Sequence, residues 1–150
     1  MEVVANGEHS MIRKLQEADI NRVADIWLDT NTKAHNFISA QYWKDHFEAV
    51  KEMFPQAEVY VYEEENKIQG FIGLNDDYIE GIFVCSEAQS GGIGKQLLDF
   101  VKDLKKQLSL SVYQKNTRAI RFYQRENFKI QYETTEEHTG EKEYYMVWEP

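Results

Sequence analysis

Several features that separate protein classes are scarce in this sequence. The chain of 150 residues has one cysteine, Cys85, so no disulfide can form within it. Its four histidines lack the spacing of metal ligands, and we expect no bound metal. No apolar run reaches the roughly 18 residues that a membrane-spanning helix needs. Disulfide-stapled, metal-folded and helical membrane proteins are therefore poor descriptions of this chain.

The charge balance and the first residues narrow the setting further. The formal net charge of −9 disfavours nucleic acid as a partner and mildly favours a cationic one, although such a charge also simply keeps a protein soluble. Residues 1–10 lack the basic start and apolar centre of a secretory signal. We treat them as an N-terminal extension or an expression remnant, because Met11 would make a plausible natural start. The composition predicts a cytoplasmic protein with no nucleic acid or membrane partner.

Proline is scarce too, and residues 11–150 show no repeat or linker, which predicts a single domain. Alternating apolar residues predict seven strands, at residues 11–16, 58–62, 68–74, 78–85, 108–113, 128–132 and 144–148. Apolar spacings of three and four predict four helices. Two of them lie between residues 19 and 53, with Asp19 as the expected cap of the first, and the others follow residue 95 and residue 116. This order predicts an α+β (α/β) fold with helices on a mixed sheet.

A glycine-rich segment, Gln89-Ser-Gly-Gly-Ile-Gly-Lys95, lies between a predicted strand and a predicted helix. Glycines let the backbone approach a phosphate, and N–H groups at a helix start bind anions, with Lys95 as a candidate cation. The same pattern also forms ordinary tight turns, so the residues alone leave both interpretations open. The segment matches neither the phosphate-binding loop of nucleoside triphosphatases nor the dinucleotide fingerprint.

Two motifs together resemble those of the GNAT superfamily of N-acetyltransferases. Gln89-x-x-Gly92-x-Gly94, after a strand ending Ile82-Phe83-Val84, resembles the coenzyme-binding signature of that superfamily. Asn116-x-x-Ala119-x-x-Phe122-Tyr123, followed by Phe128, looks like its C-terminal motif. The motifs have the order and spacing of the family, and the resemblance spans about residues 11–149. Residues 26–40 resemble, more softly, a bacterial subgroup of small uncharacterised acetyltransferases.

This resemblance implies a mainly antiparallel sheet of six or seven strands with about four helices, splayed between its fourth and fifth strands. It implies acetyl-CoA as co-substrate, with the pantetheine arm in the splay and the pyrophosphate on the glycine loop. The residues it places against the coenzyme are Ile82, Phe83, Val84, Gln89, Ser90, Gly91, Gly92, Ile93, Gly94, Lys95, Asn116, Ala119 and Phe122. Ser90 stands where the family commonly has Arg, which removes one phosphate-pairing cation. Asn127 replaces a usual glycine, and asparagine tolerates the left-handed conformation.

The implied reaction is direct attack of an amine on the thioester. Tyr123 would protonate the departing thiolate, and the alternative is an ordinary buried tyrosine. Glu80 is a candidate base because strand alternation places it on the face of Ile82, and it is equally consistent with a solvated strand carboxylate. His35 is a further candidate base, whereas Ser111 stands where some relatives carry a carboxylate and cannot serve. Cys85 has no recognisable histidine partner for a covalent route.

The acceptor pocket is the part of the fold that a motif describes least. The residues that we expect to line it are Trp27, Asn31, His35 and Phe37. Such a lining suits a small amine, a lysine side chain or a peptide N-terminus. We predict an N-acetyltransferase, with an acyl-CoA-binding sensor module without turnover as the alternative. Both a monomer and a homodimer stay open, the latter through an edge strand near residues 144–148.

Overall fold

The computed structural model describes residues 3–4 and 10–150 of the chain. Its strands are β1 (Val3–Val4), β2 (Ser10–Lys14), β3 (Glu58–Glu64), β4 (Lys67–Asn75), β5 (Tyr78–Val84), β6 (Leu108–Tyr113), β7 (Lys129–Thr135) and β8 (Lys142–Trp148). Its α-helices are α1 (Ile20–Ala34), α2 (Ala40–Met53), α3 (Ile93–Leu104) and α4 (Thr117–Arg125). Short 3-10 turns occupy Glu17–Asp19, Phe54–Gln56 and Ser86–Ala88.

The strands form one sheet in the order β1-β2-β3-β4-β5-β6-β8-β7. Every neighbouring pair is antiparallel except β5 and β6, which run parallel. The seven strands from β2 onward, with four α-helices, confirm the predicted mixed, mainly antiparallel sheet. The two residues of β1 pair with β2 and belong to the segment set aside from the sequence argument. The other residues of that segment before Ser10 lie outside the described part of the chain.

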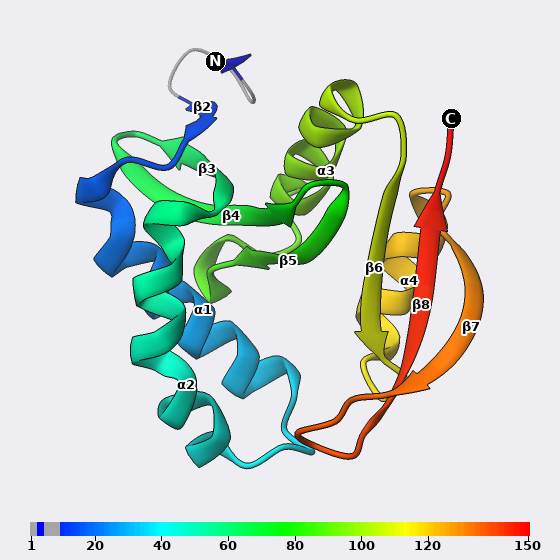
Figure 1. The fold of residues 1–150 in the computed structure, drawn as a ribbon. Helices are drawn as coiled ribbons and strands as arrows, with labels where there is room; N and C mark the ends of the chain where they lie inside the picture. The colour runs from blue at the N-terminus through cyan, green and yellow to red at the C-terminus, as the bar shows by residue number, and fades with distance from the viewer. Residues whose placement is uncertain (1–2, 5–9) are drawn as a thin grey trace.

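The sheet splits between β5 and β6, the fourth and fifth strands when β2 is counted first. Only Tyr78 and Ile79 of β5 pair with β6, opposite Ser109 and Leu110, and the two strands then diverge (Figure 1). The register of β5 against β4 shifts at this point, which leaves Glu80 as an extra residue. Such a β-bulge bends its strand and increases its twist. The predicted splay is confirmed, and the bulge at Glu80 gives its physical reason.

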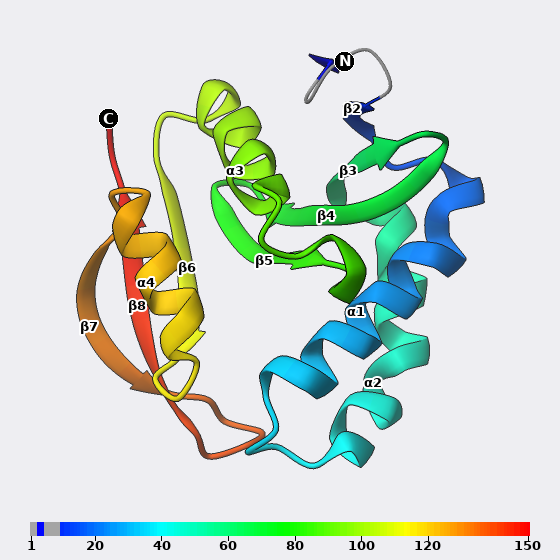
Figure 2. The ribbon, with the colours of Figure 1, turned by 180° about the vertical axis from the view of Figure 1, so that it is seen from behind.

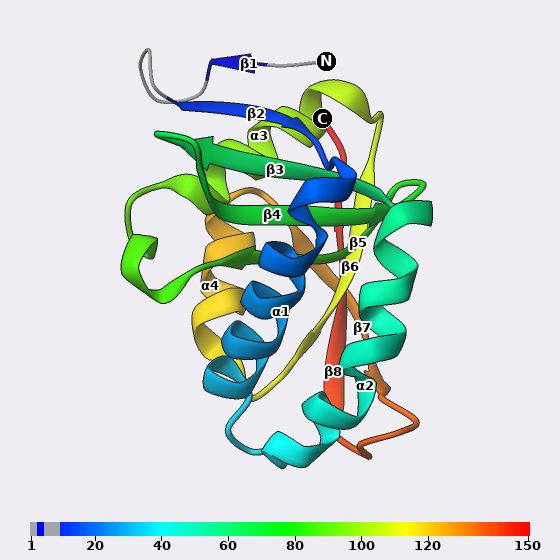
Figure 3. The same ribbon diagram turned by 90° about the vertical axis from the view of Figure 1, so that its left-hand side faces the viewer.

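Two buried clusters lie on opposite faces of the sheet. One packs Val23 of α1 with Val61 and Phe71, and the other packs Leu97 and Leu98 of α3 against the strands. Figure 3 shows α1 and α2 in front of β2–β5 with α3 behind them, and Figure 2 shows α4 over β6 and β8. The sheet is thus covered on both faces. We call the opening where β5 and β6 diverge the fork.

Side-chain oxygens cap two of the helices. Ser39 accepts a hydrogen bond from the backbone of Tyr42 at 3.3 Å, at the start of α2. Asn116 caps α4 by accepting from the N–H of Ala119 at 3.2 Å. Asp19 does not cap α1, so that expectation is wrong. Its buried carboxylate instead accepts from Arg13 Nη1 at 2.7 Å, and this ion pair takes the oxygens that a cap would need.

The open edge of the sheet also differs from the expected one. β8 lies between β6 and β7, so residues 144–148 are not an edge, and β7 is the outer strand. The chain turns back on itself after β7, which the local pattern of residues does not reveal. In the described part of the chain, no helix combines the length and apolar character needed to cross a bilayer.

Candidate active site

The fork leaves the backbone of β5 unpaired on one side. The N–H of Cys85 donates to the carbonyl of Gln69 in β4 at 2.8 Å. Because backbone groups alternate along a strand, Phe83 also points its N–H toward β4, while Ile82 and Val84 point theirs into the fork. Ile82 and Val84 therefore lie as expected for pantetheine contacts. Phe83 does not, because its N–H points toward β4. Its ring stacks on Phe71 at 4.8 Å, on the α1 face of the sheet.

The glycine loop closes over the end of β5. Gln89 Nε2 donates to the carbonyl of Val84 at 3.0 Å, which holds the loop against the strand. Ser90 and Gly92 both adopt left-handed conformations, with φ of 69° and 84°. α3 begins immediately afterwards, at Ile93, so Gly94 and the following lysine belong to the helix and not to the loop. Successive N–H groups of this loop and helix start face one region, an arrangement that binds phosphates.

Two glycines keep side chains out of the region between this loop and the fork. A Cβ added at Gly92 would meet nothing within 4 Å. A Cβ at Gly94 would lie 3.7 Å from the Phe122 ring and 3.9 Å from Ile82, between α4 and β5. Small residues therefore border the route that a pantetheine arm would take from the loop to the fork. The residues present fit acetyl-CoA.

The cations near the loop are not arranged as the sequence predicts. Lys95 Nζ pairs with Asp99 at 3.1 Å and with Glu126 at 3.2 Å, so it already has two carboxylate partners. Arg118, in the first turn of α4, instead reaches Gln89 and Ser90. Sequence analysis missed Arg118. The available signal was its place directly before Ala119 in the second motif.

Tyr123 lies in the core beside the fork. Its side chain is buried, and its ring contacts those of Phe122 and Phe128 edge to face, with centroids 5.2 and 5.4 Å away. Burial raises the pKa of its hydroxyl far above the ordinary value. The phenol therefore stays protonated at neutral pH, as a proton donor to a thiolate must. The turn after α4 also follows the prediction, since Asn127 is left-handed with φ of 72°.

Glu80 lies on the opposite face of the sheet from Ile82, so the alternation argument was wrong. The bulge adds one residue, and Ile79 and Ile82 both join the α3-side cluster. A Cβ on Gly73 would meet that of Glu80 at 3.9 Å, which places Glu80 on the α1–α2 side of the fork. Its side chain is exposed there, and partial burial of the carboxylate raises its pKa. A carboxylate thus faces the fork from the side opposite α4.

His35 is fixed in one neutral form. Asn116 uses its oxygen to cap α4, so its Nδ2 group must donate to His35 Nε2, at 3.2 Å. His35 then carries its proton on Nδ1, which is buried without a hydrogen-bond partner in the described residues. Burial lowers the pKa of His35 to about 4. Neither ring nitrogen has a free lone pair in this arrangement, so His35 does not fit the role of general base.

Aromatic rings from α1, α2 and β6 line the open side of the fork. The His35 ring packs on Tyr113 at 4.9 Å and near Phe37 at 5.7 Å. Trp27 meets Trp43 edge to face at 5.8 Å. Asn31 is buried and donates to the carbonyl of Trp27 at 2.9 Å, and this bond ties its amide to its own helix. The four expected acceptor residues thus lie together in one wall, where the amide of Asn31 is held by its own helix and the rings contact one another.

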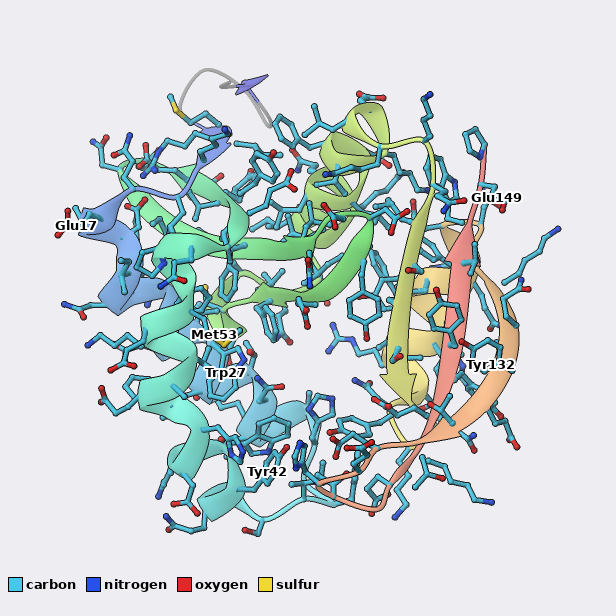
Figure 4. The ribbon with its side chains drawn as sticks, viewed as in Figure 1. Glu17, Trp27, Tyr42, Met53, Tyr132 and Glu149 are labelled. Atoms are coloured by element: carbon cyan, nitrogen blue, oxygen red, sulfur yellow. The ribbon has the colours of Figure 1, made fainter. Side chains whose placement is uncertain are left out.

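Two carboxylates that sequence analysis missed, Glu143 and Glu136, lie beside this wall. Glu143 pairs in register with Tyr113 and shares its face of the sheet. Burial and the neighbouring Glu136 raise the pKa of Glu143. Burial and both carboxylates also raise the pKa of Tyr42, whose side chain lies on the side of α2 toward β8 (Figure 4). The acceptor side of the fork is therefore both aromatic and anionic, which suits a cation.

Comparison with known proteins agrees with this geometry. The family described as acetyltransferase (GNAT) domain matches residues 55–130. Peptidyl-lysine N-acetyltransferase YiaC of Escherichia coli K12 is 37% identical over 80% of this chain and 84% of its own. The solution structure of apo YjaB from Escherichia coli superposes with a TM-score of 0.83 at 20% identity, over 93% of this chain and 97% of that one. PaiA N-acetyltransferase from Thermoplasma acidophilum, solved with coenzyme A, gives 0.79 at 16% identity, over 95% and 100%.

The family match covers half of this chain, and the alignment with YiaC covers 80% of it. The matched region holds the fork, the glycine loop and α4, the elements that the geometry assigns to the coenzyme. The chain belongs to the GNAT family of acetyltransferases.

Proposed function

We propose that this GNAT enzyme transfers the acetyl group of acetyl-CoA to lysine side chains of peptides or proteins. As a member of the family it is an acetyl-CoA-dependent N-acetyltransferase that acts on an amine. The observation that carries the choice of acceptor is the wall of rings and carboxylates on the open side of the fork. The 37% identical relative bears the name of a peptidyl-lysine N-acetyltransferase, which supports the same class.

The chain provides one group for each proton transfer. The amine nitrogen bonds to the thioester carbon, and the carbon–sulfur bond then breaks. Glu80, directly or through one water, takes the proton that the amine loses, since it faces the fork from the acceptor side. The N–H of Val84, which points into the fork, stabilises the oxyanion. Tyr123 donates its proton to the departing thiolate, and its high pKa keeps that proton in place until the thiolate forms.

The acceptor wall accounts for a long cationic substrate. A lysine side chain has an apolar stem, which packs on rings, and a cationic head, which carboxylates attract. Tyr113 and Phe37 provide rings, with centroids 5.5 Å apart, and Glu143 provides a half-buried charge on the same face as Tyr113. The attraction concentrates the ammonium form beside Glu80, where it releases one proton to solvent before the neutral amine attacks and gives its second proton to Glu80.

The composition of the chain supports one setting for the enzyme. We propose that residues 11–150 form a single domain that acts in a bacterial cytoplasm, as a monomer or homodimer, without nucleic acid or membrane partners. The net charge of −9 supports the exclusion of nucleic acid. It also favours basic segments of protein substrates by long-range steering.

Peptide acetylation with mass-spectrometric localisation tests this function. The purified protein is incubated with acetyl-CoA and two N-terminally blocked peptides, one with lysine flanked by arginines and one with lysine flanked by glutamates. We expect acetylation on the lysine nitrogen, with higher kcat/KM for the basic peptide. Spermidine serves as a small-amine comparison. Coenzyme binding without acetylation of any amine would contradict the proposal and support the sensor module instead.

A further inference from the structure

The loop between β5 and α3 can hold an anion but lacks a free cation of its own. Ser90 stands where the family commonly has arginine. Lys95 is bound by Asp99 at 3.1 Å and by Glu126 at 3.2 Å, on the side of α3 toward α4. A pyrophosphate on this loop would meet backbone N–H groups and the start of α3, but no free charge from this segment.

A cation reaches the same loop from α4. Arg118 Nη1 lies 3.4 Å from Gln89 Oε1, and Nη2 lies 3.2 Å from Ser90 Oγ. Both partners are neutral oxygens, and within the described residues no carboxylate forms an ion pair with Arg118. The side chain is exposed, so a ligand can approach it.

The position of Arg118 is unfavourable for its own helix. It lies in the first turn of α4, which contains no acidic residue, and a cation there opposes the helix dipole. An anion at this point would satisfy both Arg118 and the start of α4. The loop beside it is the one part of the described surface where left-handed backbone, a helix start and an unpaired guanidinium come together.

We propose that Arg118 supplies the missing cation and binds the pyrophosphate of acetyl-CoA, an assignment that rests on the proposed function. Its guanidinium offers two parallel N–H donors, which match two phosphate oxygens. When the coenzyme binds, these donors exchange the neutral oxygens of Gln89 and Ser90 for charged ones. The chain thus compensates from α4 for the cation that its glycine loop lacks.

Calorimetric titration with ligands that differ in their phosphates tests this assignment. The ligands are acetyl-CoA, acetyl-dephospho-CoA, which keeps the pyrophosphate but lacks the 3′-phosphate, and S-acetylpantetheine, which lacks both. We expect Arg118→Ala to weaken the first two by about tenfold, as loss of a charge-assisted pair does, and to leave the third unchanged. Arg118→Lys should recover only part of the loss, because an ammonium cannot bind bidentately.

Arg121→Ala is the matched control, since Arg121 is also exposed on α4 but, unlike Arg118, forms no hydrogen bond with the loop among the described residues. It should leave all three affinities unchanged, and thermal unfolding checks that each variant folds. Unchanged binding of acetyl-CoA by Arg118→Ala would overturn the assignment. So would an equal loss for all three ligands, or a loss that disappears without the 3′-phosphate. If the wild-type protein itself failed to bind acetyl-CoA, the proposed function would fail, a result distinct from these.

Discussion

Asn116 Nδ2 lies 3.2 Å from His35 Nε2, and this hydrogen bond joins the two halves of the sheet across the open end of the fork. His35 follows α1, which packs on β4 and β5, whereas Asn116 begins α4, which carries Tyr123 and packs beside β6. The oxygen of Asn116 also caps α4 at Ala119, so one side chain fixes both the helix and the histidine. The acceptor wall and the proposed acid are therefore tied to each other through a single amide.

The first prediction concerns the stability of the fold at low pH, where protonation of His35 would disturb its hydrogen bond with Asn116. The pKa of His35 is about 4 in the fold, against an ordinary value of 6.5 that applies when the chain unfolds. Unfolding in this range therefore takes up a proton. The contribution of His35 to the free energy of unfolding is present in full above pH 6.5 and falls as the pH drops toward 4. The loss should reach at most about 3 kcal/mol. Urea unfolding at several pH values in this range measures it.

His35→Phe should flatten that dependence, because phenylalanine keeps the ring contacts and does not titrate. His138→Gln is the control, since His138 is exposed in the β7–β8 hairpin. It should retain the wild-type pH dependence. An equal slope in His35→Phe and the wild type would show that His35 is not held neutral in solution.

The second prediction concerns the proposed acid. Tyr123→Phe keeps the ring between Phe122 and Phe128 but removes the proton that the thiolate needs. We expect kcat to fall by about 10² to 10³, the usual scale of general acid catalysis, with little change in acetyl-CoA affinity. Thiol release and calorimetry measure the two quantities. A variant with near wild-type kcat would return Tyr123 to a purely structural role.

The third prediction concerns Glu80 and the pH profile of kcat/KM. A base must be deprotonated, so activity falls as the pH drops through the raised pKa of Glu80. The acceptor amine also loses activity as it is protonated, but at a much higher pH. Glu80→Gln should remove the lower bend and reduce neutral activity by about 10². If the lower bend persisted in Glu80→Gln, another group would have to be the base.

The fourth prediction concerns the choice of acceptor. Glu143→Gln removes a half-buried charge from the face of Tyr113, so kcat/KM should fall by about fivefold for a lysine flanked by arginines. A lysine flanked by glutamates should lose nothing. Glu137→Gln, an equal charge change at an exposed position of the same hairpin, is the control. Equal effects of the two substitutions would show that the preference for the basic peptide comes from net charge alone and not from Glu143.

The elements of this fold could be predicted because their patterns are local. The boundaries of β6 agree with the sequence, and α4 begins directly after Asn116 as expected. The glycine loop between β5 and α3 was also located, because a motif fixes residue types at fixed spacings. Local pattern sufficed wherever backbone geometry alone decides the outcome.

The errors share a different cause. Glu80 was placed on the wrong face because a bulge inserts one residue, which strict alternation does not reveal. Asp19 pairs with Arg13 and does not cap its helix, and Lys95 pairs with Glu126 and does not face the loop. Only the folded chain brings these partners together. Arg118, Glu136 and Glu143 were missed for the same reason. The charged groups of the site depend on tertiary pairing and therefore needed the structure.

The last prediction separates coenzyme binding from stability at Gly94. Alanine there should be tolerated, because its Cβ would meet Phe122 and Ile82 at ordinary contact distances of 3.7 and 3.9 Å. It should even stabilise the fold, by up to about 1 kcal/mol, since Gly94 is the second residue of α3 and alanine is the better helix former. The same methyl group fills the space between α4 and β5 through which the pantetheine arm would pass. Acetyl-CoA affinity should therefore fall by at least about tenfold while the urea midpoint rises. A Gly94→Ala protein that is more stable and binds acetyl-CoA as before would show that the arm takes another path, and one that is less stable would show that the space is already filled.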